Sequence, residues 1–157
     1  MVRHEILVLK AQKYVGIQTR ILFSEAEKVD FAQLHKNVLA ARIDDIDHEE
    51  HFMAMDADFT ENSFSYTPLV PVRSFDNNEG YTRFTREQGT YCAFEVQAKD
   101  LNPAWFKEVF AYIEENRMRV ERTGYDLEYY EETYSAMIGR QDFPPERVLK
   151  ILLKMHS

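Results

Sequence analysis

One carboxylate lies within an aromatic-rich run of the chain, Tyr125–Tyr130 (YDLEYY), which we expect to form a strand. Because strand side chains alternate between two faces, Asp126, Glu128 and Tyr130 should share one of them. On a solvated face, Glu128 is an ordinary surface acid. On an apolar, aromatic face, its charge is costly to bury until a cation arrives, and aromatic rings attract that cation further. The run therefore predicts either a hydrated acid or a receptor for an apolar cation.

The other residues that could carry chemistry form weaker patterns. His48 and His51 stand in the acidic stretch DDIDHEEH, where the spacing differs from that of the HExxH zinc motif. A solvated acidic linker is the favoured interpretation of this stretch. The sequence has no glycine-rich phosphate loop and no G-x-S-x-G nucleophile elbow. We therefore predict no metal site, no cofactor and no catalytic residue, and we favour a binding protein over an enzyme.

Charge and cysteine content limit the classes of partner and compartment. The 157 residues carry a formal net charge of −8, and no basic stripe is visible. This balance repels nucleic acid and anionic membranes and mildly attracts cations, so DNA contact should come only through a separate domain. Cys92 is the single cysteine, and its alternating apolar surroundings predict a buried structural thiol. With no membrane span and no intramolecular disulfide, a cytoplasmic protein is expected.

Hydrophobic periodicity divides the chain into two similar halves, separated by the turn-rich segment Ser74–Gly80. In the first half, Ser24 is the expected N-cap of a helix over Glu25–Arg42. Pro68 and Pro71 predict that their strand is an edge strand or is bent. The expected strands of this half are His4–Leu9, Tyr14–Ile21, His51–Met55 and Phe64–Val72.

The second half repeats this order of elements. Asn102 and Pro103 predict the cap and the first residue of a helix that ends near Arg117. The segment Glu131–Pro145 is expected to be a loop. The expected strands are Tyr81–Arg86, Thr90–Gln97, Tyr125–Tyr130 and Val148–Met155.

Corresponding elements of the two halves lie about 75 to 77 residues apart, which indicates an internal repeat. We therefore predict a single α+β domain over residues 1–157, with pseudo-repeats of about 1–75 and 76–157. Each β-α-β-β unit has a sheet face that it cannot bury alone. Two such units would form one antiparallel sheet with two main helices and a central ligand cleft.

The repeat also identifies two methionines as candidate binding residues. Met53 and Met55 fall where Glu128 and Tyr130 fall in the second half. Methionine is adaptable and common on promiscuous binding surfaces, although plain core filling is the alternative interpretation.

The second half resembles the gyrase-inhibitor-like (GyrI-like) family, whose domain also forms the effector-binding part of AraC-type and MerR-type multidrug-sensing regulators. The resemblance lies in Gly89-Thr90-Tyr91-Cys92, in Trp105 near a helix start, and in Leu127-Glu128-Tyr129-Tyr130, where Leu127 replaces the usual aromatic residue. It implies a duplicated fold and a pocket with an acidic floor, where Glu128 would meet lipophilic cations. With this resemblance, the predicted ligand-binding residues are Glu128, Tyr130, Met53, Met55, Tyr91 and Trp105.

Three functions compete at this point. The leading one is a small-molecule binding domain for a cationic, aromatic ligand, the effector-sensing module of a bacterial AraC- or MerR-type transcription regulator. The second is a free-standing hydrolase that uses Glu128 as general base, with Asp126 as the nearest second carboxylate. The third is a gyrase-inhibitor-like module that binds a protein through its acidic surface. Family membership alone does not decide among these three functions.

Overall fold

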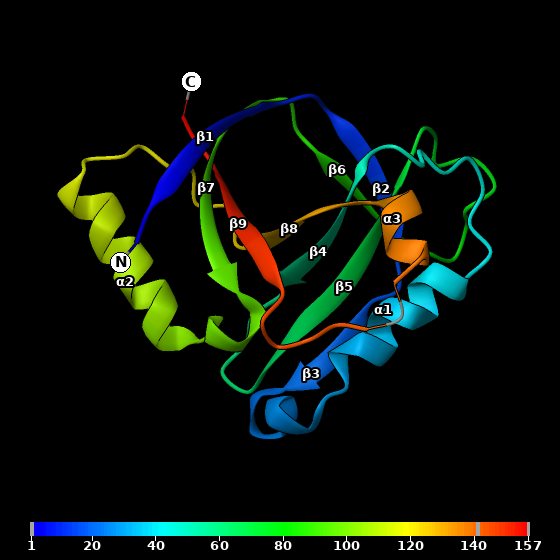
Figure 1. The fold of residues 1–157 in the computed structure, drawn as a ribbon, viewed down its shortest axis with the longest axis horizontal. Helices are drawn as coiled ribbons and strands as arrows, with labels where there is room; N and C mark the ends of the chain where they lie inside the picture. Colours follow the sequence, from blue (N-terminus) through cyan, green and yellow to red (C-terminus); the bar gives the residue numbers. More distant parts are fainter. Residues whose placement is uncertain (1, 141, 157) are drawn as a thin grey trace.

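The computed structural model describes residues 2–140 and 142–156, within which nine strands form one sheet with antiparallel pairings throughout (Figure 1). The strand order is β1-β7-β9-β8-β4-β5-β2-β6, and β3 pairs with β5. The predicted α+β class, antiparallel sheet and two main helices are confirmed. The strands are β1 (His4–Leu9), β2 (Gln12–Gly16), β3 (Thr19–Leu22), β4 (His51–Ala57), β5 (Ser63–Val72), β6 (Thr82–Arg86), β7 (Gly89–Gln97), β8 (Asp126–Thr133) and β9 (Val148–Lys154).

The sheet curls until its two ends approach one another. β1 lies at one end of the strand order and β2 lies near the other, yet only Lys10 and Ala11 join them. Because two linking residues span roughly 10 Å at most, the two ends must be close, as the upper part of Figure 1 shows. Leu7 of β1 and Phe84 of β6 accordingly pack in one apolar cluster. We call the concave side that holds this cluster the inner face, and the opposite side the outer face.

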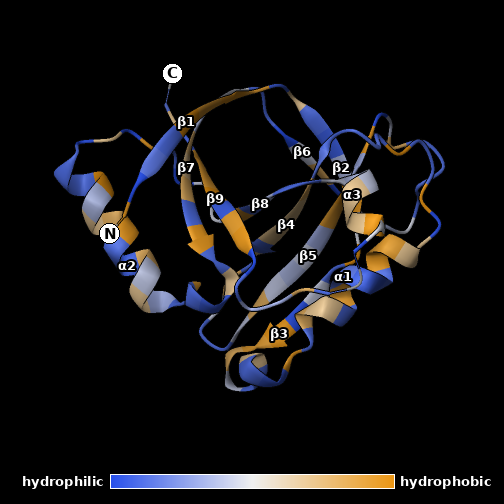
Figure 2. Ribbon diagram, viewed as in Figure 1, coloured by the Kyte–Doolittle hydropathy of each residue, from blue (hydrophilic) through white to orange (hydrophobic). Residues whose placement is uncertain are grey.

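Two helices cover the outer face. Helix α1 (Phe31–Ala40) buries Val38 over β5, and helix α2 (Pro103–Glu115) buries Val109 and Ile113 beside Phe94 of β7. The predicted start of α2 is confirmed, because the Asn102 side chain accepts a hydrogen bond from the backbone N–H of Trp105 at 2.9 Å. Between the helices, the sheet presents an unusual strand. Figure 2 shows β8 as mostly hydrophilic, although it lies in the middle of the sheet next to the largely apolar β9.

The predicted helix over Glu25–Arg42 is wrong in its first third. A short 3₁₀ helix, η1 (Phe23–Lys28), comes first, and Val29 is extended with φ −74° and ψ 129°. The α-helix then starts at Phe31, because the Asp30 carboxylate accepts a hydrogen bond from the backbone N–H of Gln33 at 3.1 Å. Asp30 is therefore the N-cap that we had assigned to Ser24.

The predicted strand Tyr14–Ile21 is two strands, β2 and β3, with Ile17 and Gln18 between them. β5 contains two prolines, yet it is an interior strand and not the predicted edge strand. The break between β2 and β3 makes room for one of these prolines. Gly16 pairs with Leu69 and Thr19 pairs with Tyr66, so Pro68 lies opposite the break, where no ladder hydrogen bond needs its missing N–H. A Cβ atom on Gly16 would lie 2.2 Å from the Pro68 carbonyl oxygen, so only glycine allows this approach.

The predicted loop over Glu131–Pro145 is partly structured. β8 continues to Thr133, and a short helix, α3 (Tyr134–Ile138), follows directly. The Thr133 hydroxyl caps this helix by accepting a hydrogen bond from the backbone N–H of Ala136 at 3.3 Å. The cap residue stands in the acidic run EET, and the five-residue helix that follows is too short to show apolar periodicity. The sequence pattern therefore did not predict this helix.

The single cysteine behaves as predicted. Cys92 is fully buried on β7, and burial raises the pKa of its thiol to about 11, so the reactive thiolate is disfavoured. No helix in residues 2–140 or 142–156 has the length and hydrophobicity that a bilayer crossing requires.

Candidate functional site

Glu128 is buried in the middle of the sheet. It lies on the outer face of β8, its side chain flanked by Ala54 of β4 and Ile151 of β9, and only 5% of its surface is exposed. The surrounding apolar cluster includes Phe52 and Tyr130. Of the two fates that the sequence allows for this carboxylate, the structure shows the buried one, among aromatic and aliphatic side chains.

A chain of polar groups reaches Glu128 from helix α1. The Tyr130 hydroxyl donates a hydrogen bond to Glu128 Oε1 at 3.1 Å. Tyr66 of β5 is buried nearby, and its hydroxyl oxygen lies 2.5 Å from His35 Nε2. Burial, followed by the nearby Glu128 charge, holds the pKa of both tyrosines well above the usual value. Both hydroxyls therefore stay protonated and available as donors.

His35 brings no positive charge to this chain. Burial, and to a smaller extent the nearby Arg147 guanidinium, lowers the pKa of its imidazole to about 3. The ring is therefore neutral at physiological pH, and its Nδ1 atom is buried without a hydrogen-bond partner.

Two more carboxyl groups join Glu128 to form what we call the acidic cluster: Asp56, Asp126 and Glu128. Asp56 of β4 pairs directly with Asp126 of β8, and both lie on the same face as Glu128. Burial and then the Glu128 charge raise the pKa of Asp126 to about 6. The same two causes hold the pKa of Asp56 well above its usual value. No lysine or arginine of the described residues forms an ion pair with these three acids.

The segment before β9 closes the Tyr130 end of the cluster. The Phe143 ring lies 4.3 Å from the His35 ring, centroid to centroid. The Arg147 guanidinium lies over the Phe143 ring at 4.5 Å and near the Tyr130 ring at 5.8 Å. Arg147 pairs with Glu132 at 3.4 Å and leaves the acidic cluster uncompensated.

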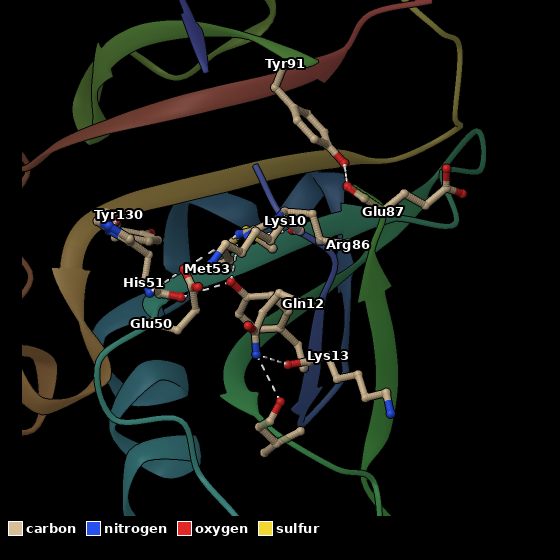
Figure 3. Close-up of polar contacts among 12 residues, drawn as sticks. Lys10, Gln12, Lys13, Glu50, His51, Met53, Arg86, Glu87, Tyr91 and Tyr130 are labelled. Carbon is tan, nitrogen blue, oxygen red and sulfur yellow. Dashed lines mark hydrogen bonds and ion pairs between the residues drawn. The ribbon is translucent and has the colours of Figure 1, made fainter. Parts of the chain in front are cut away.

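The six predicted ligand-binding residues fall into separate places: Glu128 and Tyr130 lie together on the outer face, and three of the others lie together on the inner face. Met53 and Met55 point to the inner face, because Ala54 is the residue of β4 that pairs with Glu128. Tyr91 also lies in the inner-face cluster, and its hydroxyl donates to the Glu87 carbonyl oxygen at 2.6 Å (Figure 3).

Trp105, on α2, is partly buried and lines a surface hollow of about 550 Å³ with Val96 and Val148. A second hollow, of about 400 Å³, lies between β3 and the start of α1. Glu128 lines neither of these two hollows. The two histidines of the acidic linker are separated: His48 packs on Tyr134, and His51 stacks on Tyr129. Within the described part of the chain, no group of three or more His, Cys, Asp or Glu side chains is placed to hold a metal ion.

The inner face is organised by a buried arginine that the sequence did not reveal. Arg86 of β6 is 2% exposed and donates hydrogen bonds to the Tyr14 hydroxyl at 3.0 Å and the Lys10 carbonyl oxygen at 3.1 Å (Figure 3). It also approaches the Met53 sulfur at 3.9 Å and the Glu50 carboxylate at 4.0 Å. These bonds hold β6 against the link between β1 and β2. Met53 packs within this buried network around Arg86.

Sequence reasoning missed three members of the buried chain: Asp56, Tyr66 and His35. Asp56 lies one residue beyond the predicted strand, and because the repeat had placed Met53 and Met55 on the Glu128 face, alternation would have assigned Asp56 to the other face. His35 follows Leu34 on the apolar side of a predicted helix, where a lone histidine carries no signal of its own. Tyr66 is placed near Glu128 by the pairing of β5 with β4, and this long-range pairing cannot be read from the sequence.

Comparison with known proteins places the chain in a structural group. Residues 5–146 match Cass2, described as integron-associated effector binding protein. The structure of SAV2435 bound to tetraphenylphosphonium is similar, with a TM-score of 0.64 and 13% identity over 99% of this chain and 94% of that one. The Vibrio cholerae integron cassette protein VCH_CASS2 has a TM-score of 0.53 and 12% identity, over 98% of this chain and 95% of that one.

A third similar protein is EcmrR. Its C-terminal domain has a TM-score of 0.66 and 13% identity, with 100% of this chain and 99% of that one covered. In an EcmrR–DNA complex, the match covers 99% of this chain but 58% of the EcmrR chain. At these identities the likenesses establish the fold. A search among curated protein sequences finds no significant match.

Proposed function

The chain belongs to the Cass2 family of integron-associated effector binding proteins, and we propose that it binds a lipophilic organic cation at Glu128 to sense a small-molecule effector. Its fold is that of the GyrI-like effector-binding domains. The family supplies the general role, effector binding. The residues of the acidic cluster indicate the chemical class of the ligand.

The observation that carries the proposal is a buried carboxylate without a compensating cation. Glu128 is surrounded by Phe52, Ala54, Tyr130 and Ile151, and no lysine or arginine among the described residues pairs with it. A buried charge in such surroundings is destabilising unless an opposite charge neutralises it. A cation that is itself apolar loses little hydration on entry and gains attraction from the aromatic rings. An organic cation therefore fits this site better than a neutral or anionic ligand.

The similar proteins support this ligand class. SAV2435 is described as bound to tetraphenylphosphonium, a permanent cation with four phenyl rings. Glu128 itself is buried, so we propose that the ligand selects a conformation in which the segment around Phe143 has moved from His35. The affinity for such a ligand is then reduced by the cost of this opening.

We also propose that the domain serves a bacterial transcription regulator, of MerR or AraC type, in the cytoplasm. The similarity to EcmrR supports this, because the match leaves about two fifths of that DNA-bound chain to other parts. The acidic net charge of −8 fits a domain that leaves DNA contact to another segment or another chain. The lone buried thiol fits a reducing compartment.

Titration with tetraphenylphosphonium tests the ligand proposal. We expect a Kd in the micromolar range for the wild type by isothermal titration calorimetry. In Glu128→Gln the opposite charge is lost, and two unit charges about 5 Å apart interact by roughly 3 kcal/mol at an effective dielectric constant near 20. After allowance for retained apolar contacts, we expect binding at least about tenfold weaker.

The matched control is Glu131→Gln, which changes an exposed carboxylate three residues further along the same strand. It should bind tetraphenylphosphonium like the wild type. Unchanged affinity in Glu128→Gln would count against the assigned role of Glu128.

A hydrolase is the second candidate function, and one observation favours it. The pKa of Asp126, raised to about 6 by burial and the Glu128 charge, suits a general base near neutral pH. Turnover of activated esters or epoxides by the purified wild type, lost in Asp126→Asn, would support this function over simple binding.

A further inference from the structure

We propose that Arg147 and His35 form an anion-binding extension of the cation site, so that the preferred effector is a lipophilic cation that also carries an aromatic carboxylate. The proposal rests on the proposed function, because the cationic part of the ligand stays at Glu128. It adds two residues that neither the sequence pattern nor the family resemblance indicates. It also narrows the ligand class from organic cations to aromatic zwitterions.

Two buried nitrogen atoms near Tyr130 lack hydrogen-bond partners. Arg147 is 6% exposed and His35 is 2% exposed, and neither Arg147 Nε nor His35 Nδ1 has a partner. Both side chains lie close to the Tyr130 ring, at 5.8 Å for the guanidinium and 5.7 Å for the imidazole. An unsatisfied buried polar group costs free energy, and a ligand that bonds to it recovers that cost.

The Arg147 guanidinium is also short of negative charge. Glu132 Oε1 accepts hydrogen bonds from Arg140 at 2.8 Å and from Arg147 at 3.4 Å, so one carboxylate oxygen serves two positive groups. Among the described residues, no other carboxylate forms an ion pair with Arg147. Arg147 also contacts the Met137 sulfur at 3.6 Å, and a thioether is a weak acceptor. These partners leave the guanidinium able to bind a carboxylate through strong, charge-assisted hydrogen bonds.

The ring of Phe143 occupies the place that we assign to the aromatic part of the ligand. It contacts both side chains, with its centroid 4.3 Å from that of the His35 ring and 4.5 Å from the Arg147 guanidinium. Phe143 is only partly buried, so its displacement opens a path from solvent to both side chains. A ligand ring replaces the ring contacts of Phe143, and its carboxylate adds hydrogen bonds that phenylalanine cannot make.

Arg147 stays in place when Phe143 moves, because its own backbone is anchored. Its N–H donates to the Pro144 carbonyl oxygen at 3.0 Å, and its carbonyl oxygen accepts from the Ala98 N–H at 2.8 Å. His35 is held by its Nε2 contact with the Tyr66 hydroxyl at 2.5 Å. A hydroxyl can donate as well as accept, so the neutral imidazole can carry its proton on Nδ1 and donate it to a carboxylate.

One small molecule can reach both charged groups, because both lie against the same tyrosine. The Tyr130 hydroxyl donates to Glu128 at 3.1 Å, while the Arg147 guanidinium lies near the ring of Tyr130. The site therefore offers a negative group and a positive group about one tyrosine side chain apart. A zwitterion whose cation and carboxylate are separated by one aromatic ring matches this arrangement.

Two phosphonium ions that differ by a single carboxylate, benzyltriphenylphosphonium and (4-carboxybenzyl)triphenylphosphonium, test the proposal by isothermal titration calorimetry at pH 7.5. The protein carries a net charge of −8, so an added carboxylate should weaken binding unless a positive group receives it. For the wild type we expect the carboxylated ion to bind at least about tenfold more tightly, because hydrogen bonds between charged groups are strong at a buried arginine. In Arg147→Met, this preference should disappear or reverse.

The matched control is Arg83→Met, which removes an exposed arginine of β6. It should keep the wild-type preference for the carboxylated ion. If Arg147→Met does not fold, a crystal structure of the wild type with the carboxylated ion decides. The carboxylate should lie within hydrogen-bond distance of Arg147, and a carboxylate in bulk solvent would overturn the proposal.

The outcomes separate the two proposals. Equal affinity of the wild type for both ions, or tighter binding of benzyltriphenylphosphonium, would overturn the anion-binding extension and leave the binding function intact. A preference for the carboxylated ion that survives Arg147→Met would overturn the assignment to Arg147. Failure of the wild type to bind either ion would overturn the binding function, and the extension with it.

Discussion

Asp126 gives a sharp test of the electrostatics around Glu128, and the test needs no ligand. Its pKa rises from 3.8 to about 6 in the folded protein, first because of burial and then because of the Glu128 charge. A folded-state pKa above the unfolded value means that the folded protein binds the proton more tightly. Below about pH 4 both states are protonated and the folded state pays no penalty. As the pH rises towards 6, ionisation becomes progressively more unfavourable for the folded state, and above 6 the penalty is complete.

The size of this penalty follows from the shift. At about 1.36 kcal/mol per pKa unit, moving from 3.8 to about 6 gives an upper limit of roughly 3 kcal/mol. Asp126 is partly exposed, so solvent screening reduces this value, and we expect about 1–2 kcal/mol at pH 7.5. The substitution Asp126→Asn removes the ionisation at nearly constant shape. It should therefore raise the free energy of unfolding at pH 7.5 and have a smaller effect at pH 5.

Urea unfolding of the wild type and Asp126→Asn at both pH values measures the difference. The exposed Asp58→Asn serves as the reference and should show no such pH dependence. An equal effect of Asp126→Asn at pH 5 and pH 7.5, or a loss of stability at pH 7.5, would refute the reasoning. Either result would mean that the Glu128 charge does not reach Asp126 through a poorly solvated site.

Two further predictions concern the scaffold and the inner face. Arg86→Met removes the guanidinium that binds Tyr14 and Lys10 and approaches Glu50, so we expect urea unfolding to show a loss of about 3 kcal/mol. Because Arg86 lies on the inner face, the Kd of the folded variant for tetraphenylphosphonium should stay within about twofold of the wild type; a large change would move the site to that face. Asp30→Ala removes the cap of α1 and should lower the free energy of unfolding by about 1 kcal/mol; an unchanged value would show that the helix start is set by tertiary packing instead.

Local signals in the sequence predicted the elements whose ends depend on nearby residues. Asn102 and Pro103 set the start of α2 through one hydrogen bond and one fixed φ, and both are readable from the sequence. The start of α1 was misplaced because Ser24 and Asp30 are both good caps, and only packing selects between them. Buried strands such as β7 and β9 were predicted within about a residue, since their apolar runs are bounded by turns.

The composition of the site depends on strand register, which is not a local property. The internal repeat made Met53 the counterpart of Glu128, but in the ladder between β4 and β8 Glu128 pairs with Ala54, and Met53 pairs with Tyr129. A shift of one residue moves every side chain to the other face. Met53 and Met55 therefore lie on the face away from Glu128, while Asp56, one position beyond the predicted strand, lies on the Glu128 face.

The curl of the sheet was also beyond the reach of periodicity. Only the short link between β1 and β2 reveals that the sheet ends meet, and only then is there an enclosed inner face around Arg86. Arginine in a five-residue strand such as TRFTR reads as a surface residue. Its burial follows from where β6 is placed by strands far away in the sequence.

The position of a bound cation tests the central claim most directly. A crystal structure of the wild type with tetraphenylphosphonium should place the phosphorus nearer to the Glu128 carboxylate than to any other carboxylate, with the ring of Phe143 displaced from His35. A phosphonium seated instead in the hollow beside Trp105, or on the inner face near Tyr91, with Glu128 still enclosed, would contradict the account.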